Sequence, residues 1–198
     1  MAYSAEDVKK LRDLTGAGMM DCKAALEASK GEVEGAVEHL RKKGLADAAK
    51  KQHREARDGL IHAYIHQTGK MGVLIEVDCE TDFVAKSPDF RKLAKELALQ
   101  VAGYEPRWVS RDDVPDEVLV HERNVYEAKA QEDGKPEQII PKIVEGQVEN
   151  FLKQNCLLEQ PYFREPSHTV QQLIAENISR LQENITVRRF ARFNIRES

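Results

Sequence analysis

Val77-Asp78-Cys79-Glu80-Thr81-Asp82-Phe83-Val84-Ala85-Lys86 joins two segments that differ in the period of their apolar residues. Before it, every second residue is apolar, as in a half-buried strand: Val73, Ile75, Val77 and Cys79. After it, Ser87-Pro88-Asp89 supplies an N-cap, a proline at the first helical position and an early acidic residue. Apolar residues then follow at helical spacing: Phe90, Leu93, Leu97 and Val101. The stretch is therefore predicted to form a corner between a strand and a helix.

The composition is that of a globular protein. Hydrophobic residues make up 41% and charged residues 32% of the sequence. A length of 198 residues is enough for one ordinary domain or for a small domain with a larger one. The formal net charge of −4 offers nucleic acid no general electrostatic attraction. No apolar run approaches the roughly 18 residues of a membrane span, and the N-terminus lacks the features of a signal peptide. The widely spaced Cys22, Cys79 and Cys156 favour a reducing compartment, so a cytoplasmic location is expected.

Residues 1–44 are predicted to form a three-helix domain. The first helix has an apolar stripe of Val8, Leu11 and Leu14, and the turn Gly16-Ala17-Gly18 ends it. Gly31 is predicted to end the second helix and Gly44 the third. A unit this small buries little surface and is only marginally stable alone, so docking is its expected role.

Two basic segments allow alternative interpretations. Residues 41–57 form either a nucleic-acid or ribosome-binding patch or a solvated helical linker. The absence of interleaved aromatics for base stacking, together with several alanines, favours a basic helical linker over 45–57. The arginines of 188–196 are likewise interpreted as charges that guard a strand edge rather than as a nucleic-acid strip.

Residues 58–198 are predicted to form an α+β core and dimerisation domain, with a small antiparallel sheet flanked by helices. An antiparallel hairpin is expected from 60–67 and 73–79, and a closing strand from 185–195. Residues 107–109 are predicted to form a brief strand or a packed loop. Residues 157–163 are predicted to form an extended segment. Helices are expected over 90–103, 116–133 and 170–181. A further helix in 139–152 must begin or bend at Pro141, because proline removes a backbone donor there.

The chemistry of the corner is open from the residues alone. Phe83 can be a core plug, with Thr81 or Asp82 capping a turn. A hydrolase using Cys79 and His62 is a competing interpretation, although no third orienting group is evident. His62 and His66 lie four residues apart, which on a strand is ~13 Å and too far to share one metal ion. No phosphate-binding glycine loop or metal-ligand cluster is present, so neither a cofactor nor a metal is expected.

Three motifs, in order along nearly the whole chain, resemble the translation elongation factor Ts family. The first is Cys79-Glu80-Thr81-Asp82-Phe83-Val84-Ala85-Lys86, and the second is Leu14-Thr15-Gly16-Ala17-Gly18-Met19-Met20-Asp21-Cys22-Lys23-Ala24-Ala25-Leu26. The third comprises Gly134-Lys135-Pro136, Lys142-Ile143-Val144-Glu145-Gly146 and Leu157-Leu158-Glu159-Gln160-Pro161-Tyr162-Phe163. The resemblance implies a non-enzymatic guanine-nucleotide exchange factor. Such a factor binds GDP-bound elongation factor Tu, disturbs its Mg²⁺ site and promotes GDP release so that GTP can bind.

The resemblance also assigns roles to residues. Thr81, Asp82, Phe83 and Val84 would form the partner-binding corner, where Phe83 inserts beside the partner's Mg²⁺ site and Asp82 helps hold the geometry. The N-terminal helices would resemble a ubiquitin-associated domain and dock on the partner's GTP-binding domain. The docking candidates are Gly16, Ala17, Gly18 and Met19. A single Thr-Asp-Phe-Val motif resembles the short family members and implies a homodimer that pairs closing-strand sheets. No direct contact with nucleic acid or membrane is expected.

Overall fold

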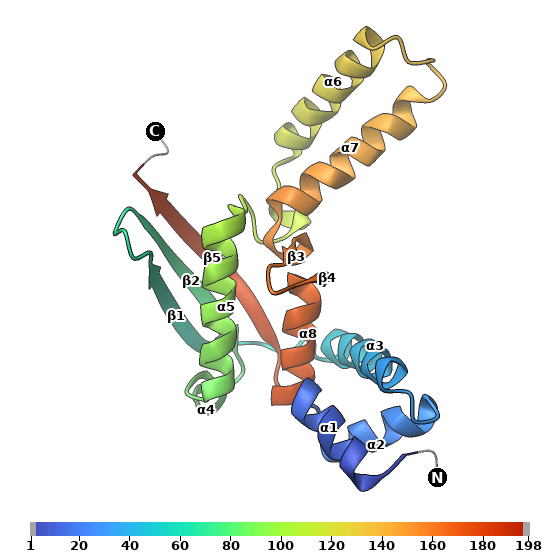
Figure 1. Cartoon of the computed structure of the whole chain (residues 1–198). Coiled ribbons are helices and arrows are strands. Elements are labelled where there is room, and N and C mark those ends of the chain that lie inside the picture. The colour runs from blue at the N-terminus through green and yellow to red at the C-terminus, as the bar shows by residue number, and fades with distance from the viewer. Residues whose placement is uncertain (1–2, 196–198) are drawn as a thin grey trace. The chain divides into compact units, whose positions relative to one another are not determined.

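The structure, a computed structural model, describes residues 3–195 and has an α+β fold (Figure 1). Its larger sheet has three strands in the order β1-β2-β5: β1 is Asp58–Ile65, β2 is Met71–Cys79 and β5 is Ile185–Asn194. A smaller two-stranded sheet pairs β3 (Pro161–Tyr162) with β4 (Glu165–Thr169). The predicted α+β class, hairpin strands and closing strand are confirmed. No helix within 3–195 is both long and apolar enough to cross a membrane.

The chain divides into two compact units, each built from separate stretches of sequence. The first unit contains residues 1–62, 76–95 and 171–187, and the second contains the other described residues. This grouping does not follow the predicted boundaries 1–44, 45–57 and 58–198, which stay a prediction about domain organisation.

The first unit begins with three helices, as predicted. These are α1 (Ala5–Thr15), α2 (Met19–Ala28) and α3 (Val33–Lys51), drawn in blue to cyan in Figure 1. Ser4 caps α1 in a capping box with Asp7, which satisfies backbone donors at the start of the helix. The three helices enclose a core of six buried residues: Val8, Leu11, Cys22, Ala25, Leu26 and Ala36.

The predicted end of the third helix at Gly44 is wrong, because α3 continues to Lys51. Gly44 is buried within α3, where a Cβ would lie 3.7 Å from the carbonyl oxygen of Ala175 in α8 (Val170–Leu181). Gly44 therefore packs against the neighbouring helix, and a Cβ at this position would make an ordinary van der Waals contact. Of the predicted basic helical linker 45–57, residues 45–51 are helical as the last part of α3, and their role as a linker stays a prediction.

The β2 strand shows the predicted alternation. Val73, Ile75, Val77 and Cys79 are fully or almost fully buried, whereas Leu74 between them is 47% exposed. On β1, Gly59 approaches β2 so closely that a Cβ would lie 2.3 Å from the carbonyl oxygen of Val77. Only glycine fits at that position.

Two helices follow β2. The short α4 spans Asp82–Ala85, and α5 spans Pro88–Tyr104. Just before α5, the side-chain oxygen of Ser87 accepts the N–H of Phe90 at 3.3 Å. The apolar positions predicted for this helix are buried: Phe90, Leu93, Leu97 and Val101. The predicted helix after the corner is therefore confirmed.

In the second unit, α6 (Asp116–Glu132) and α7 (Ile140–Asn155) form a helical hairpin, yellow and orange in Figure 1. The helix predicted to begin or bend at Pro141 is α7, which begins one residue earlier, at Ile140, and Pro141 lies in its first turn. At the base of the hairpin, Val148, Phe151 and Leu152 pack in a small core together with half-buried Trp108. Trp108 makes a single β-bridge with Cys156 rather than a strand.

The segment between α7 and α8 differs from the prediction. Leu157–Glu159 forms a 3-10 turn, and the hairpin of β3 and β4 was missed. Gln160 is buried at the start of this hairpin, where its side-chain amide donates to the carbonyl oxygens of Gln154 and Tyr104 at 2.7 and 3.1 Å. This segment is held by hydrogen bonds of buried polar side chains and lacks an alternation of apolar residues. The sequence pattern therefore did not reveal these strands.

Candidate functional site

The corner after β2 holds Phe83 out of the core. Thr81 is the N-cap of α4, and its side-chain oxygen accepts the N–H of Val84 at 3.4 Å. Val84 and Ala85 are 7% and 6% exposed, so they anchor one side of this short helix in the protein. Phe83 is 82% exposed. The core-plug interpretation of Phe83 is therefore wrong.

The predicted corner residues differ in what they present to a partner. Thr81, Asp82 and Phe83 are exposed, whereas Val84 is buried and can contribute to binding only by holding the corner. The Asp82 carboxylate accepts a hydrogen bond from Lys86 at 2.5 Å. This contact lowers the pKa of Asp82 and raises that of Lys86. Asp82 is thus ionised at neutral pH, but the pair is exposed and adds little stability.

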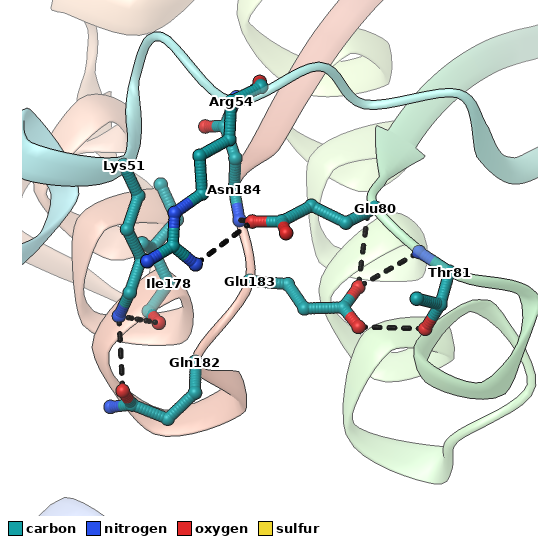
Figure 2. Close-up of polar contacts among 8 residues, drawn as sticks. All are labelled: Lys51, Arg54, Glu80, Thr81, Ile178, Gln182, Glu183 and Asn184. Atoms are coloured by element: carbon teal, nitrogen blue, oxygen red, sulfur yellow. Dashed lines mark hydrogen bonds and ion pairs between the residues drawn. The ribbon is translucent and has the colours of Figure 1, made fainter.

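The corner is also tied to the turn between α8 and β5. The Glu183 carboxylate accepts the backbone N–H of Glu80 at 3.1 Å and that of Thr81 at 3.0 Å. Its other oxygen accepts the Thr81 hydroxyl at 2.6 Å. Figure 2 shows these contacts. Sequence reasoning missed Glu183, because no periodicity or motif links it to a residue about a hundred positions earlier.

The N-terminal docking candidates lie in the connection between α1 and α2. Gly16 adopts a left-handed conformation with φ of 68° and donates its N–H to the carbonyl oxygen of Arg12 at 2.7 Å. Gly18 is the N-cap of α2, and Ala17 packs against the helical core. Met19 is 48% exposed. Gly16 and Gly18 therefore shape the turn, and Met19 is the candidate that presents a large apolar side chain.

Two exposed apolar residues next to this turn were not among the candidates. Met20 is 73% exposed and Leu14 is 69% exposed. The prediction that Leu14 belongs to the buried stripe of α1 is wrong, since only Val8 and Leu11 of that stripe reach the core. Adjacent methionines at the start of a helix were the available signal, because neighbouring helical positions cannot both face one core.

The competing hydrolase interpretation does not fit the state of its cysteine. Cys79 is fully buried, and burial raises the pKa of its thiol to about 11. A thiol with that pKa is about one part in ten thousand thiolate at pH 7. Burial also lowers the pKa of His62. Among residues 3–195, no group of three His, Cys, Asp or Glu side chains could hold a metal ion.

We expect iodoacetamide to modify native Cys79 about a hundredfold or more slowly at pH 7 than it modifies the urea-unfolded chain, because the folded thiol is buried and carries a raised pKa. The native rate should increase as the pH rises toward 11. Peptide mass spectrometry after timed labelling measures both rates. Rapid modification of native Cys79 at pH 7 would revive the nucleophile interpretation.

Most basic residues of 41–57 are engaged with carboxylates. Lys42 contacts Glu38 at 2.8 Å, Arg57 contacts Glu55 at 2.5 Å, and Lys43 contacts Asp21. Lys51 is buried. Such pairing favours the solvated-linker interpretation over a nucleic-acid patch. In the closing strand, Arg192 pairs with Glu105, while Arg196 lies outside the described residues.

The sequence of this chain matches a known protein family over most of its length. The family model described as Elongation factor TS matches residues 45–197, a range that contains the corner and the turn that holds it. The chain belongs to the elongation factor Ts family. It is 55% identical over 194 residues to elongation factor Ts of Moorella thermoacetica, covering 98% of this chain and 96% of that protein. With the Coprothermobacter proteolyticus protein it shares 55% identity over the full length of both chains.

A third relative, elongation factor Ts of Geobacter sulfurreducens, is 51% identical over 197 residues, covering 100% of this chain and 91% of that protein. The similarity to elongation factor Ts includes α1, α2 and the part of α3 that lies before residue 45, where the range matched by the family model begins. The resemblance inferred from the three motifs is confirmed, and the chain has the role of a translation elongation factor.

Proposed function

We propose that this chain is the guanine-nucleotide exchange factor for elongation factor Tu. It binds the GDP-bound partner, disturbs the Mg²⁺ site and promotes GDP release so that GTP can bind. The observation that carries the proposal is the 82% exposure of Phe83 on a corner whose neighbours Val84 and Ala85 are buried. An apolar ring held in water by an anchored backbone is suited to insertion into another protein. The chain acts in the cytoplasm, without direct contact with nucleic acid or membrane.

The proposed mechanism is differential binding rather than covalent chemistry, so the chain is not an enzyme in the usual sense. An exchange factor must bind the nucleotide-free partner more tightly than the GDP-bound partner. Linkage then requires GDP and the factor to weaken each other's binding by the same ratio. Insertion of Phe83 beside the Mg²⁺ site, with Asp82 alongside it, supplies contacts that are complete only when the nucleotide site is distorted.

The energy of Phe83 alone is too small for the whole effect. Burying one phenylalanine side chain contributes about 1.5–3 kcal/mol, which corresponds to a factor of about ten to a hundred in an equilibrium constant. Additional binding energy must come from a second contact. The exposed Leu14, Met19 and Met20 of the N-terminal unit provide an apolar surface for docking on the partner's GTP-binding domain.

The test is the release of a fluorescent GDP analogue from elongation factor Tu, with and without this protein. Release should accelerate with increasing concentration of the chain and then saturate, since the chain and GDP act through a common complex. Release that stays at its spontaneous rate at every concentration would overturn the proposal.

We further propose that the chain forms a homodimer through its three-stranded sheet. Within the second unit, a shallow and mostly apolar groove is lined by Ile65, Leu74, Phe193 and Ile195. These four side chains are between 47% and 75% exposed. A contiguous apolar patch on a sheet is typical of an interaction surface. A second copy is the occupant that agrees with the single corner motif, because a two-fold interface lets one patch bury itself.

Phe193→Asp should convert the dimer to a monomer, because it places a charge among the exposed side chains that line the apolar groove. Sedimentation at micromolar concentration measures the change. Phe83→Asp is the matched control: it also replaces an exposed phenylalanine by aspartate, but outside the groove, and it should leave the dimer intact. A wild-type chain that sediments as a monomer would remove the homodimer proposal.

A further inference from the structure

The corner that carries Phe83 is too short to hold its own direction. The α4 helix has four residues, and helix formation is unfavourable until several consecutive hydrogen bonds have formed. Thr81 is the N-cap of this helix, Asp82 is its first residue and Phe83 is its second. The direction of the ring therefore depends on two supports: the buried Val84 and Ala85 on one side of α4, and the contacts that fix Thr81 at its N-terminus.

Thr81 is fixed by Glu183. The carboxylate receives the Thr81 N–H, the Thr81 hydroxyl and the Glu80 N–H at 3.0, 2.6 and 3.1 Å. A charged acceptor makes each of these bonds stronger than one between neutral groups. The Thr81 hydroxyl in turn accepts the N–H of Val84, so the chain of contacts runs from Glu183 into the backbone of α4.

The two segments hold each other reciprocally (Figure 2). While Glu183 of the turn receives backbone donors from the corner, Glu80 of the corner receives the backbone N–H of Asn184 at 2.6 Å. The Asn184 side-chain amide donates to the carbonyl oxygen of Arg54 at 2.8 Å, and the Arg54 guanidinium lies 3.5 Å from Glu80. Arg54 thus supplies a positive charge beside one of two neighbouring carboxylates.

The turn itself is held in an uncommon conformation. Gln182 has a left-handed backbone with φ of 63°, which non-glycine residues rarely adopt unless the surroundings impose it. Lys51, buried at the end of α3, donates to the Gln182 side-chain oxygen at 3.2 Å and lies 3.5 Å from the carbonyl oxygen of Ile178. A cation at the last turn of α8 is also favoured by the helix dipole. The turn is therefore a fixed support for Glu183.

We infer that Glu183 is a positioning residue for Phe83. Through Thr81 it keeps α4 formed and the Phe83 ring directed outward before the partner arrives. Without Glu183 the corner must be ordered during binding, and that ordering opposes ring insertion. The inference rests on the proposed exchange function, which it deepens by naming the residue that prepares the inserting ring. Glu183 itself does not have to touch the partner.

The test measures GDP release from elongation factor Tu over a range of concentrations of the full chain. Glu183→Ala should lower the maximal release rate about tenfold, because it removes all three charge-assisted hydrogen bonds. The concentration at half-maximal rate should change less than about twofold, since docking through the N-terminal helices is untouched. Glu183→Gln keeps one acceptor oxygen and should give an intermediate rate. Glu137→Ala, an exposed glutamate between α6 and α7, is the control and should match the wild type.

A double-mutant cycle separates positioning from a general structural role. In a Phe83→Ala background, Glu183→Ala should cause little further loss, because the ring that Glu183 positions is already absent. A full tenfold loss in that background, or wild-type rates for Glu183→Ala, would overturn the inference. If Glu183→Ala does not fold, as judged by circular dichroism and thermal unfolding, the same comparison made with Glu183→Gln decides.

A second readout does not depend on exchange activity. The Val84 amide, which donates to Thr81, should lose protection from hydrogen exchange in Glu183→Ala, whereas amides in the middle of α5 should keep theirs. Unchanged protection at Val84 would contradict the positioning role. If the wild-type chain fails to accelerate GDP release, the proposed function fails, and the hydrogen-exchange result still shows whether Glu183 orders the corner.

Discussion

Phe83→Ala is expected to lower the maximal rate of GDP release from elongation factor Tu by about ten- to a hundredfold, the range set by burying one phenylalanine side chain. The same substitution should leave the free energy of unfolding within about 0.5 kcal/mol of the wild type, as for other surface changes. Phe83 is 82% exposed, so its removal leaves no cavity in the chain. The loss should therefore appear in exchange and not in folding.

The measurement combines fluorescent-GDP release at saturating concentrations of the chain with urea unfolding of the same preparations. Asp82→Ala is a useful companion, because it removes the neighbouring carboxylate but keeps the ring, and a milder loss is expected. A Phe83→Ala chain that exchanges at the wild-type rate would show that the ring is not inserted.

Phe90→Ala should have the opposite profile. Phe90 is fully buried, and replacing a buried phenylalanine by alanine destabilises a core by about 3–5 kcal/mol through lost transfer energy and the remaining cavity. This is the largest stability effect expected from any single substitution considered for this chain. Exchange, corrected for the fraction of folded molecules, should stay close to the wild-type value.

Urea and thermal unfolding measure the Phe90 effect, and Phe83→Ala is its matched control because the same chemical change is made seven residues earlier. A destabilisation below about 1 kcal/mol for Phe90→Ala would mean that the site collapses around the alanine. Destabilisation of similar size by both variants would contradict the assignment of one phenylalanine to the core and the other to the partner.

Much of the fold could be predicted because its elements have strong periodic signals. The alternation through Val77 and Cys79 and the helical spacing from Phe90 onward both survive in the structure. Pro141 marked the beginning of α7 for a simple steric reason, since a proline in the first turn needs no backbone donor. Signals of this kind depend on near neighbours in the chain.

The parts that could not be predicted depend on distant neighbours. Phe83 and Phe90 are both aromatic residues beside a helix start, and only the break between α4 and α5 places one in water and the other in the core. Glu183 contacts Thr81 across about a hundred residues. Gly44 reads as a helix stop until α8 is seen beside it. In each case the deciding contact is tertiary.

These observations give the exchange proposal a specific structural form. A four-residue helix presents an aromatic ring, buried neighbours hold one side of it, and a carboxylate from a distant turn fixes its N-cap. The remaining binding energy is assigned to the exposed apolar residues of the N-terminal helices. Each part can be removed separately, so its contribution can be measured separately.

In the proposed mechanism, this chain and GDP oppose each other's binding to elongation factor Tu. Calorimetric titration of the chain into nucleotide-free and into GDP-saturated elongation factor Tu measures this opposition. Binding should be tighter to the nucleotide-free form, and the ratio of the two affinities should fall by about ten- to a hundredfold in Phe83→Ala. Equal affinity for the two forms would contradict this mechanism, because a ligand that does not distinguish two states cannot shift the equilibrium between them.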